Sequence, residues 1–191
     1  MEKTIILQQT ASWVLEEMAK NDPAHDARHI QAVVRLTRQL CQSEGADAFR
    51  AELLAWLHDL HDDKLISCRA CSETEAFLRR MGVSQADIDF VIKGIPYISY
   101  RKYPKLDDTI PLEIRIVQDA DRIEAMGATG IARTFAYGGA NNRSLEESLQ
   151  HFDDKLLKLY DLLSTDGAKK LAQPRHALLQ SFYDAFRQEN E

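Results

Sequence analysis

The segment 51–60 most constrains the fold, because it is apolar on nearly every side of one helix (AELLAWLHDL). A helix without a broad polar face must be covered by neighbouring elements all round. Elsewhere apolar residues recur with helical spacing almost throughout, whereas alternating strand-like runs are scarce. We therefore expect an all-α fold, a single compact bundle of about eight or nine helices, with the segment 51–60 near its centre.

Two further segments carry clear local signals. Ser144 and Glu147 form a capping box, and the apolar residues after it predict one continuous helix with a buried stripe. That stripe consists of Leu145, Leu149, Phe152, Leu156, Leu159 and Leu163. The segment 99–111 (SYRKYPKLDDTIP) combines prolines with mixed charge, which predicts a long loop before the helix of Asp119 and Asp121.

Ionisable side chains occur on three of the helices expected to be buried. His58 and Asp59 end the most apolar helix, where an unpaired buried carboxylate would be costly. His29 shares a helical face with core residues, and Asp121 lies in a helix rich in apolar residues. An isolated His-Asp doublet is more often a surface pair, but a common divalent ion would account for all of these groups together.

The order of these residues resembles a known family. The pattern H…HD…D, with His29 in HDARHI, the His58–Asp59 doublet and Asp121 in ADRI, resembles the HD superfamily of metal-dependent phosphohydrolases. The stretches HDARHIQAV, LLAWLHDLHDDK, IVQDADRIEAMGATGIARTFAYGG and HFDDKLLKL are similar to small bacterial HD hydrolases, which include nucleoside-triphosphate pyrophosphohydrolases. The similarity spans roughly residues 14–186.

The resemblance implies that His29, His58, Asp59 and Asp121 hold one divalent metal ion, with Asp119 as the alternative to Asp121. Two imidazoles and two carboxylates suit Mn, Fe, Co, Zn, Ni or Mg without selecting one. Such an ion acidifies a bound water, which then acts as the nucleophile at phosphorus.

Residues near these motifs are candidates for catalysis and substrate binding, although each cation among them could instead be a solvated or structural charge. Asp62 and Asp63 extend the doublet to HDLHDD, similar to an HDxxED pattern, and Asp62 is expected to orient the water or act as general base. The alternative for both is an acidic helix end in solvent. Expected phosphate-binding cations are Arg28, Lys64, Arg122 and Arg133. Further candidates are His151 and Lys155 at the pocket, and His25 and Asp26 as groups that orient His29.

Chain length, net charge and the distribution of apolar residues limit the domain organisation and the classes of partner. We expect a single HD domain over 1–191, with the motif core at about 25–125 and C-terminal helices at about 126–187 packed on it. The net charge of -6 gives no general attraction for a nucleic-acid polymer. No apolar run of about 18 residues or secretory segment occurs, which predicts no membrane association and a cytoplasmic location.

The sequence therefore favours a metal-dependent phosphohydrolase that cleaves a phosphoester or phosphoanhydride bond in a small, nucleotide-like substrate. An alternative is a nucleotide-sensing or partner-binding module with little turnover, since no base-recognition motif is present. The oligomeric state stays open.

Overall fold

The computed structural model describes residues 2–21, 27–60, 68–103 and 105–190, and every regular element in these ranges is helical. The expectation of an all-α fold with eight or nine helices is confirmed. The helices are α1 (Lys3–Asn21), α2 (Ala27–Glu44), α3 (Ala48–Leu57), α4 (Cys68–Arg80), α5 (Gln85–Ile98), α6 (Leu112–Glu124), α7 (Gly127–Ala140), α8 (Leu145–Asp154) and α9 (Asp166–Asn190). None of the helices in these ranges is both long and apolar enough to cross a lipid bilayer.

Helix α3 lies at the centre of the N-terminal helices, as its apolar sequence predicts. The Asp47 carboxylate caps it by accepting hydrogen bonds from the backbone N–H groups of Phe49 and Arg50. All residues from 51 to 57 are buried, and α1, α2, α5 and α6 pack around them. Glu52 is buried among them and forms an ion pair with Arg38 of α2. Because α3 is covered by other helices, the positions of His58 and Asp59 at its C-terminal end are fixed.

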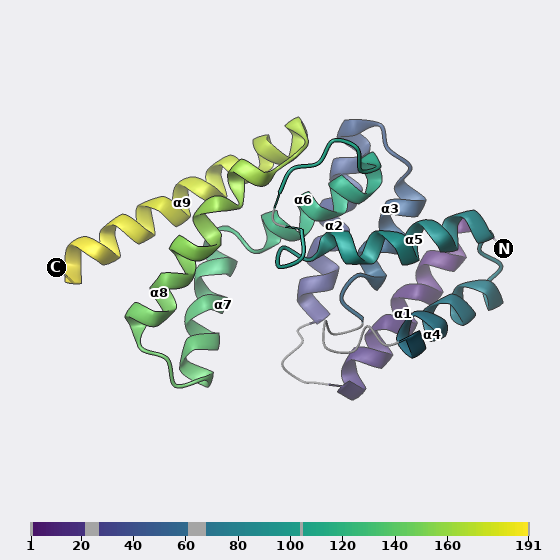
Figure 1. Ribbon diagram of the computed structural model, residues 1–191, viewed down its shortest axis with the longest axis horizontal. Helices are drawn as coiled ribbons and strands as arrows, with labels where there is room; N and C mark the ends of the chain where they lie inside the picture. Colours follow the sequence, from purple (N-terminus) through teal and green to yellow (C-terminus); the bar gives the residue numbers. More distant parts are fainter. Residues whose placement is uncertain (1, 22–26, 61–67, 104, 191) are drawn as a thin grey trace.

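The helices fall into two groups that meet at α6 (Figure 1). Helices α1 to α6 lie on one side, and α7, α8 and α9 lie on the other. Helix α9 packs against α7, α6 and α2, which holds the second group against the first. The chain passes from α6 to α7 through Gly127, whose φ of 73° lies in the left-handed region that favours glycine.

The loop expected over 99–111 is present between α5 and α6, and α6 begins directly after Pro111. Helix α6 has almost no solvent face, because every residue from 116 to 124 except Asp121 is buried. Its carboxylates and its arginine are therefore held among other parts of the chain, and each must find a partner there.

The helix that begins at Ser144 is shorter than the sequence predicts. The capping box of Ser144 and Glu147 is present, but α8 ends at Asp154 and the chain continues as the short 3-10 turns η2 (Leu156–Lys158) and η3 (Tyr160–Leu162). Leu145, placed in the buried stripe by its spacing, is 56% exposed. The expectation of one continuous helix is wrong: Lys155 leaves the helical conformation, with a φ of -137° and a ψ of -61°. Further along, backbone groups of residues 162, 164 and 165 bond to side chains of α6.

Candidate metal centre

Three potential metal ligands from three separate elements converge at the junction of α2, α3 and α6. His29 Nε2 lies 3.4 Å from Asp121 Oδ1, and His58 Nε2 lies 3.9 Å from the same oxygen. One ligand atom from each of the three residues can be chosen so that all lie within 4.8 Å of one another. Atoms that each lie about 2.0–2.2 Å from one ion are at most about 4.4 Å apart, so small movements of these side chains would bring all three atoms to coordination distance.

Hydrogen bonds fix the two imidazoles so that their Nε2 atoms face Asp121. His58 Nδ1 lies 2.8 Å from the carbonyl oxygen of Ala55, and His29 Nδ1 lies 2.7 Å from Glu124 Oε2. A carbonyl oxygen and a carboxylate only accept, so each Nδ1 carries the proton. In a neutral imidazole the lone pair is then on Nε2, the state in which histidine binds a metal.

Asp59 lines the same cavity as His29 and Asp121, but it is not one of the three residues whose ligand atoms lie within 4.8 Å of one another. The cavity has a volume of about 530 Å³ and lies where the two groups of helices meet. Two imidazole nitrogens with carboxylate oxygens form a donor set that fits a divalent ion and cancels its charge. The residues present therefore fit the metal ion that the sequence pattern implies.

Asp119 and Asp121 lie on different sides of α6. Asp119 is fully buried and accepts hydrogen bonds of 2.9 Å from the backbone N–H groups of Ser164 and Thr165 and from the Thr165 hydroxyl. Burial raises the pKa of Asp119, while these hydrogen bonds act in the opposite direction. With its oxygens engaged by the segment before α9, Asp119 serves to anchor that segment, and Asp121 is the carboxylate beside the histidines.

Arg122 is directed into the protein. Its side chain is buried and donates to the carbonyl oxygens of Leu162, at 2.6 Å, and Tyr103, at 3.1 Å. Burial lowers the pKa of Arg122, partly offset by the charges of Asp119 and Asp121. Arg122 is not among the described residues that line the cavity, and its contacts tie η3 and the loop before α6 to α6.

Arg133 and Arg28 are placed differently from Arg122. Arg133 of α7 lines the cavity and donates to Glu124 Oε2 at 2.5 Å, the same oxygen that His29 contacts. Arg28 is an exposed residue in the first turn of α2, adjacent to His29 in sequence. Of these two cations, Arg133 is the one whose position in the cavity is defined.

Several expected residues lie outside the described ranges. Asp62, Asp63, Lys64, His25 and Asp26 are among them, so their expected roles remain predictions from the sequence.

His151 and Lys155, the two further pocket candidates, also line the cavity. The ammonium group of Lys155 lies 5.2 Å from the ring centroid of Tyr100 in the loop before α6. The loop therefore reaches the C-terminal group of helices at this point.

Sequence reasoning did not identify Glu124, the residue that contacts both His29 and Arg133. Its side chain is only 5% exposed. Its position three residues after Asp121 on a helix is the signal that could have found it, because residues three apart share a face. The cavity residue Tyr137 and its neighbour Arg143 were missed as well. Tyr137 stands in the family-like stretch that ends in AYGG, which could have singled it out, whereas Arg143 lies outside the stretches that resemble the family.

The carboxylates around His29 change its titration. Burial lowers the pKa of His29, but the hydrogen bond to Glu124 and the charges of Asp121, Glu124 and Asp59 outweigh it, so the net pKa lies above the usual 6.5. In the absence of a metal ion, a proton on His29 provides part of the positive charge that balances these carboxylates. The cluster is thus built to hold positive charge.

Comparisons with known proteins agree with this geometry. No protein-family model matches the chain. The uncharacterized protein YpgQ of Bacillus subtilis is 36% identical over 182 residues, which cover 92% of this chain and 89% of YpgQ. The crystal structure of YpgQ superposes with a TM-score of 0.83 at 34% identity, covering 99% of this chain and 97% of that one. YpgQ in complex with ADP gives a TM-score of 0.83 at 33% identity, with the same coverage.

A solved HD-superfamily hydrolase from Bacillus thuringiensis is 33% identical, covers 98% of both chains and has a TM-score of 0.84. Identity and fold agree over nearly the full length of both proteins. The chain therefore belongs to the HD superfamily of metal-dependent phosphohydrolases.

Proposed function

We propose that this enzyme holds one divalent metal ion with His29, His58, Asp59 and Asp121 and hydrolyses a phosphoester or phosphoanhydride bond in a nucleotide-like molecule. The observation that carries the proposal is the convergence of the two Nε2 atoms on Asp121, with each Nδ1 fixed by a hydrogen bond. Histidines that only stabilise a fold have no need to present both lone pairs to one carboxylate.

The bound ion would supply an acidified water and neutralise charge on a phosphate oxygen. The protein supplies the orientation. Glu124 and the Ala55 carbonyl hold the imidazoles, and the covered helix α3 fixes His58 and Asp59. We assign orientation of the attacking water to Asp62, with Asp63 beside it, by analogy with the HDxxED pattern. The ion is Mn, Fe, Co, Zn, Ni or Mg, since this donor set selects none of them.

A nucleotide is the proposed substrate class for two reasons. YpgQ was solved in complex with ADP, which supports a nucleotide ligand for a protein of the same fold. In this chain Arg133, Lys155 and His151 line the same cavity as the carboxylates, where they can contact phosphate oxygens. The finer proposal is that the enzyme releases pyrophosphate from a nucleoside triphosphate.

The test begins with protein stripped of metal by a chelator. Mn²⁺, Co²⁺ or Mg²⁺ is then added with a panel of nucleoside mono-, di- and triphosphates, and the release of phosphate and of pyrophosphate is measured separately. His58→Ala and Asp59→Ala should abolish metal-dependent turnover. Asp89→Ala, on the exposed surface of α5, is the matched control and should retain it.

Release of pyrophosphate alone from triphosphates would support the finer proposal. Nucleotide binding without turnover under any of the metals would instead favour the nucleotide-sensing module. Turnover that survives in both His58→Ala and Asp59→Ala would refute the proposed metal centre.

A further inference from the structure

A recess opens from the metal cavity between α7, α8 and the turn that joins them. Its volume is about 310 Å³. The residues that line it are Arg133, Thr134, Tyr137, Arg143, Ser148 and His151. Arg133, Thr134, Tyr137 and His151 also line the metal cavity, so the two spaces share a wall and one ligand can extend from one into the other.

The two spaces differ in charge. The metal cavity contains the carboxylates of Asp59, Asp121 and Glu124, whereas none of the six residues that line the recess is acidic. The recess instead contains the guanidinium groups of Arg133 and Arg143 in a chain whose formal net charge is -6. A local excess of cations in an acidic protein indicates a site for an anion.

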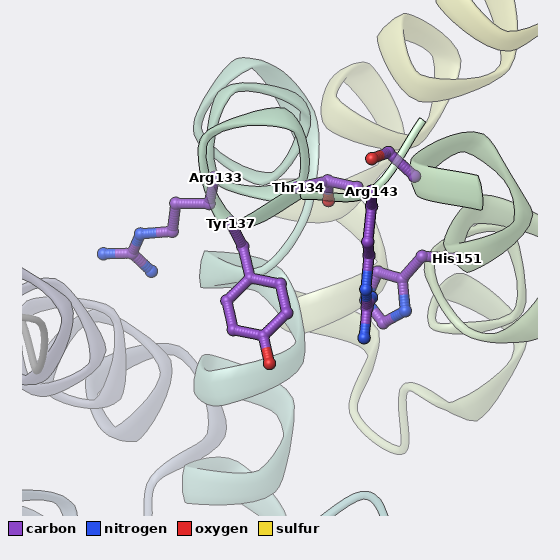
Figure 2. Close-up of a pocket in the computed structure, with 6 residues that line it drawn as sticks. Arg133, Thr134, Tyr137, Arg143 and His151 are labelled. Atoms are coloured by element: carbon purple, nitrogen blue, oxygen red, sulfur yellow. The ribbon is translucent and has the colours of Figure 1, made fainter. Parts of the chain in front are cut away.

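Tyr137, Arg143 and His151 form one side of the recess. Figure 2 shows the phenol oxygen of Tyr137 and the guanidinium of Arg143 pointing the same way beside His151, while Arg133 extends in another direction. The Arg143 guanidinium lies 5.0 Å from the centroid of the Tyr137 ring, which supports it from one side. Among the described residues, Arg143 has no carboxylate partner.

The backbone of α7 is shaped to let α8 approach at this recess. A Cβ atom on Gly138 would lie 2.1 Å from Ser148 Oγ, so only glycine allows this approach without a shift. Burial, together with the positive charges of Lys155 and Arg143, lowers the pKa of His151, although Asp154 acts in the opposite direction. His151 is therefore a neutral side chain that can donate one N–H, in surroundings that are already positive.

We propose that this recess is a second anion-binding subsite, which holds a phosphoryl group of the ligand that is not bound at the metal. The inference rests on the proposed function, because the first phosphoryl group lies at the metal centre. Arg143 is the specificity-determining residue, and Arg133 stands between the two positions. The ligand class is a compound with at least two linked phosphates, either a nucleotide tail or an inorganic polyphosphate.

The test is isothermal titration calorimetry with the Mg²⁺-loaded enzyme. Orthophosphate is compared with methylenediphosphonate, whose P–C–P bridge cannot be hydrolysed. We expect the diphosphonate to bind at least about tenfold more tightly, as a charge-assisted hydrogen bond to a second group would provide. Arg143→Gln should reduce this ratio to below about threefold, and Arg143→Lys should give an intermediate ratio, because it keeps the charge but loses the planar guanidinium that lies over Tyr137.

Arg79→Gln is the matched control, since Arg79 is exposed on α4 and pairs with Glu75, and it should leave the ratio unchanged. The adenosine ester of methylenediphosphonate separates the two sources. Tighter binding than the free diphosphonate indicates a nucleotide tail, and equal binding indicates an inorganic chain. An unchanged ratio in Arg143→Gln would overturn the proposal. Because binding is measured without turnover, that result is distinct from a failure of hydrolysis, which would leave the recess intact.

Discussion

Replacement of Glu124 by glutamine is the sharpest test of how the metal centre is held. The Glu124 carboxylate contacts His29 Nδ1 at 2.7 Å and Arg133 at 2.5 Å through the same oxygen, Oε2. Glutamine preserves the size of the side chain but removes its charge. Its carbonyl oxygen can still accept, although the NH₂ group now adds donors to a place that already has two.

We expect Glu124→Gln to weaken metal binding by roughly 30-fold. Loss of a group that orients a metal-bound histidine typically costs about 10- to 100-fold in affinity. We place the effect at the middle of that range on a logarithmic scale, because the carboxylate is almost fully buried and its charge also holds Arg133. The factor corresponds to about 2 kcal/mol of binding free energy.

The assay is titration of the metal-free protein with Co²⁺, followed by visible absorption. Glu189→Gln at the exposed end of α9 is the matched control and should bind Co²⁺ like the wild type. Thermal melting without metal checks that the variant is folded. A dissociation constant within about threefold of the wild type, in a folded variant, would refute the assigned role of Glu124.

The pH dependence of metal binding provides an independent readout of the same contact. Because the pKa of His29 is raised above 6.5, a proton competes with the ion, and metal affinity should fall as pH drops through that pKa. For the metal-free protein, folding stability depends on pH in the opposite sense. The stabilising contribution of His29 is fully present below the pKa that His29 has in the unfolded state, and it is lost as pH rises through the higher pKa of the folded state. In Glu124→Gln, both transitions should move to lower pH, as NMR titration of the imidazole would show.

Three further changes test the surrounding structure. Arg122→Met leaves the carbonyl oxygens of Leu162 and Tyr103 without this donor and should lower the free energy of unfolding by about 2–4 kcal/mol in urea denaturation. A loss below about 1 kcal/mol would contradict the anchoring role of Arg122. Gly138→Ala should lower the melting temperature, and adding Ser148→Ala should recover at least half of the loss, since it removes the clashing Oγ atom. Burial raises the pKa of Cys41 from 9.0 to about 11, so folding stability should decline between these pH values, and less steeply in Cys41→Ala.

The features that the sequence predicts well are those encoded within one segment. The apolar helix that ends at His58 and the capping box at Ser144 each depend on neighbouring residues, and both are present in the structure. Periodicity failed after Asp154, where Phe152 and Leu156 keep a helical spacing although the helix has ended. Apolar spacing indicates which residues are buried. It does not predict that side chains distant in sequence will form hydrogen bonds with the backbone.

The choice between Asp119 and Asp121 shows a second limit. Both lie in DAD, and a helical wheel places them on different sides of α6 without saying which side faces the histidines. That depends on the segment 163–165, which provides the three donors to Asp119. Arg122 is a similar case, since its acceptors belong to Tyr103 and Leu162, far from it in sequence.

Within six positions, α6 presents Asp119 to the segment before α9, Asp121 to the histidines, Arg122 to Leu162 and Tyr103, and Glu124 to Arg133. Each added or deleted residue turns the following part of a helix by about 100°. A one-residue insertion between Asp119 and Glu124 would therefore turn the side chains after it away from their partners. No side-chain replacement could restore the original directions. The length of this stretch should therefore be invariant among functional descendants of the protein, even where its apolar residues exchange freely.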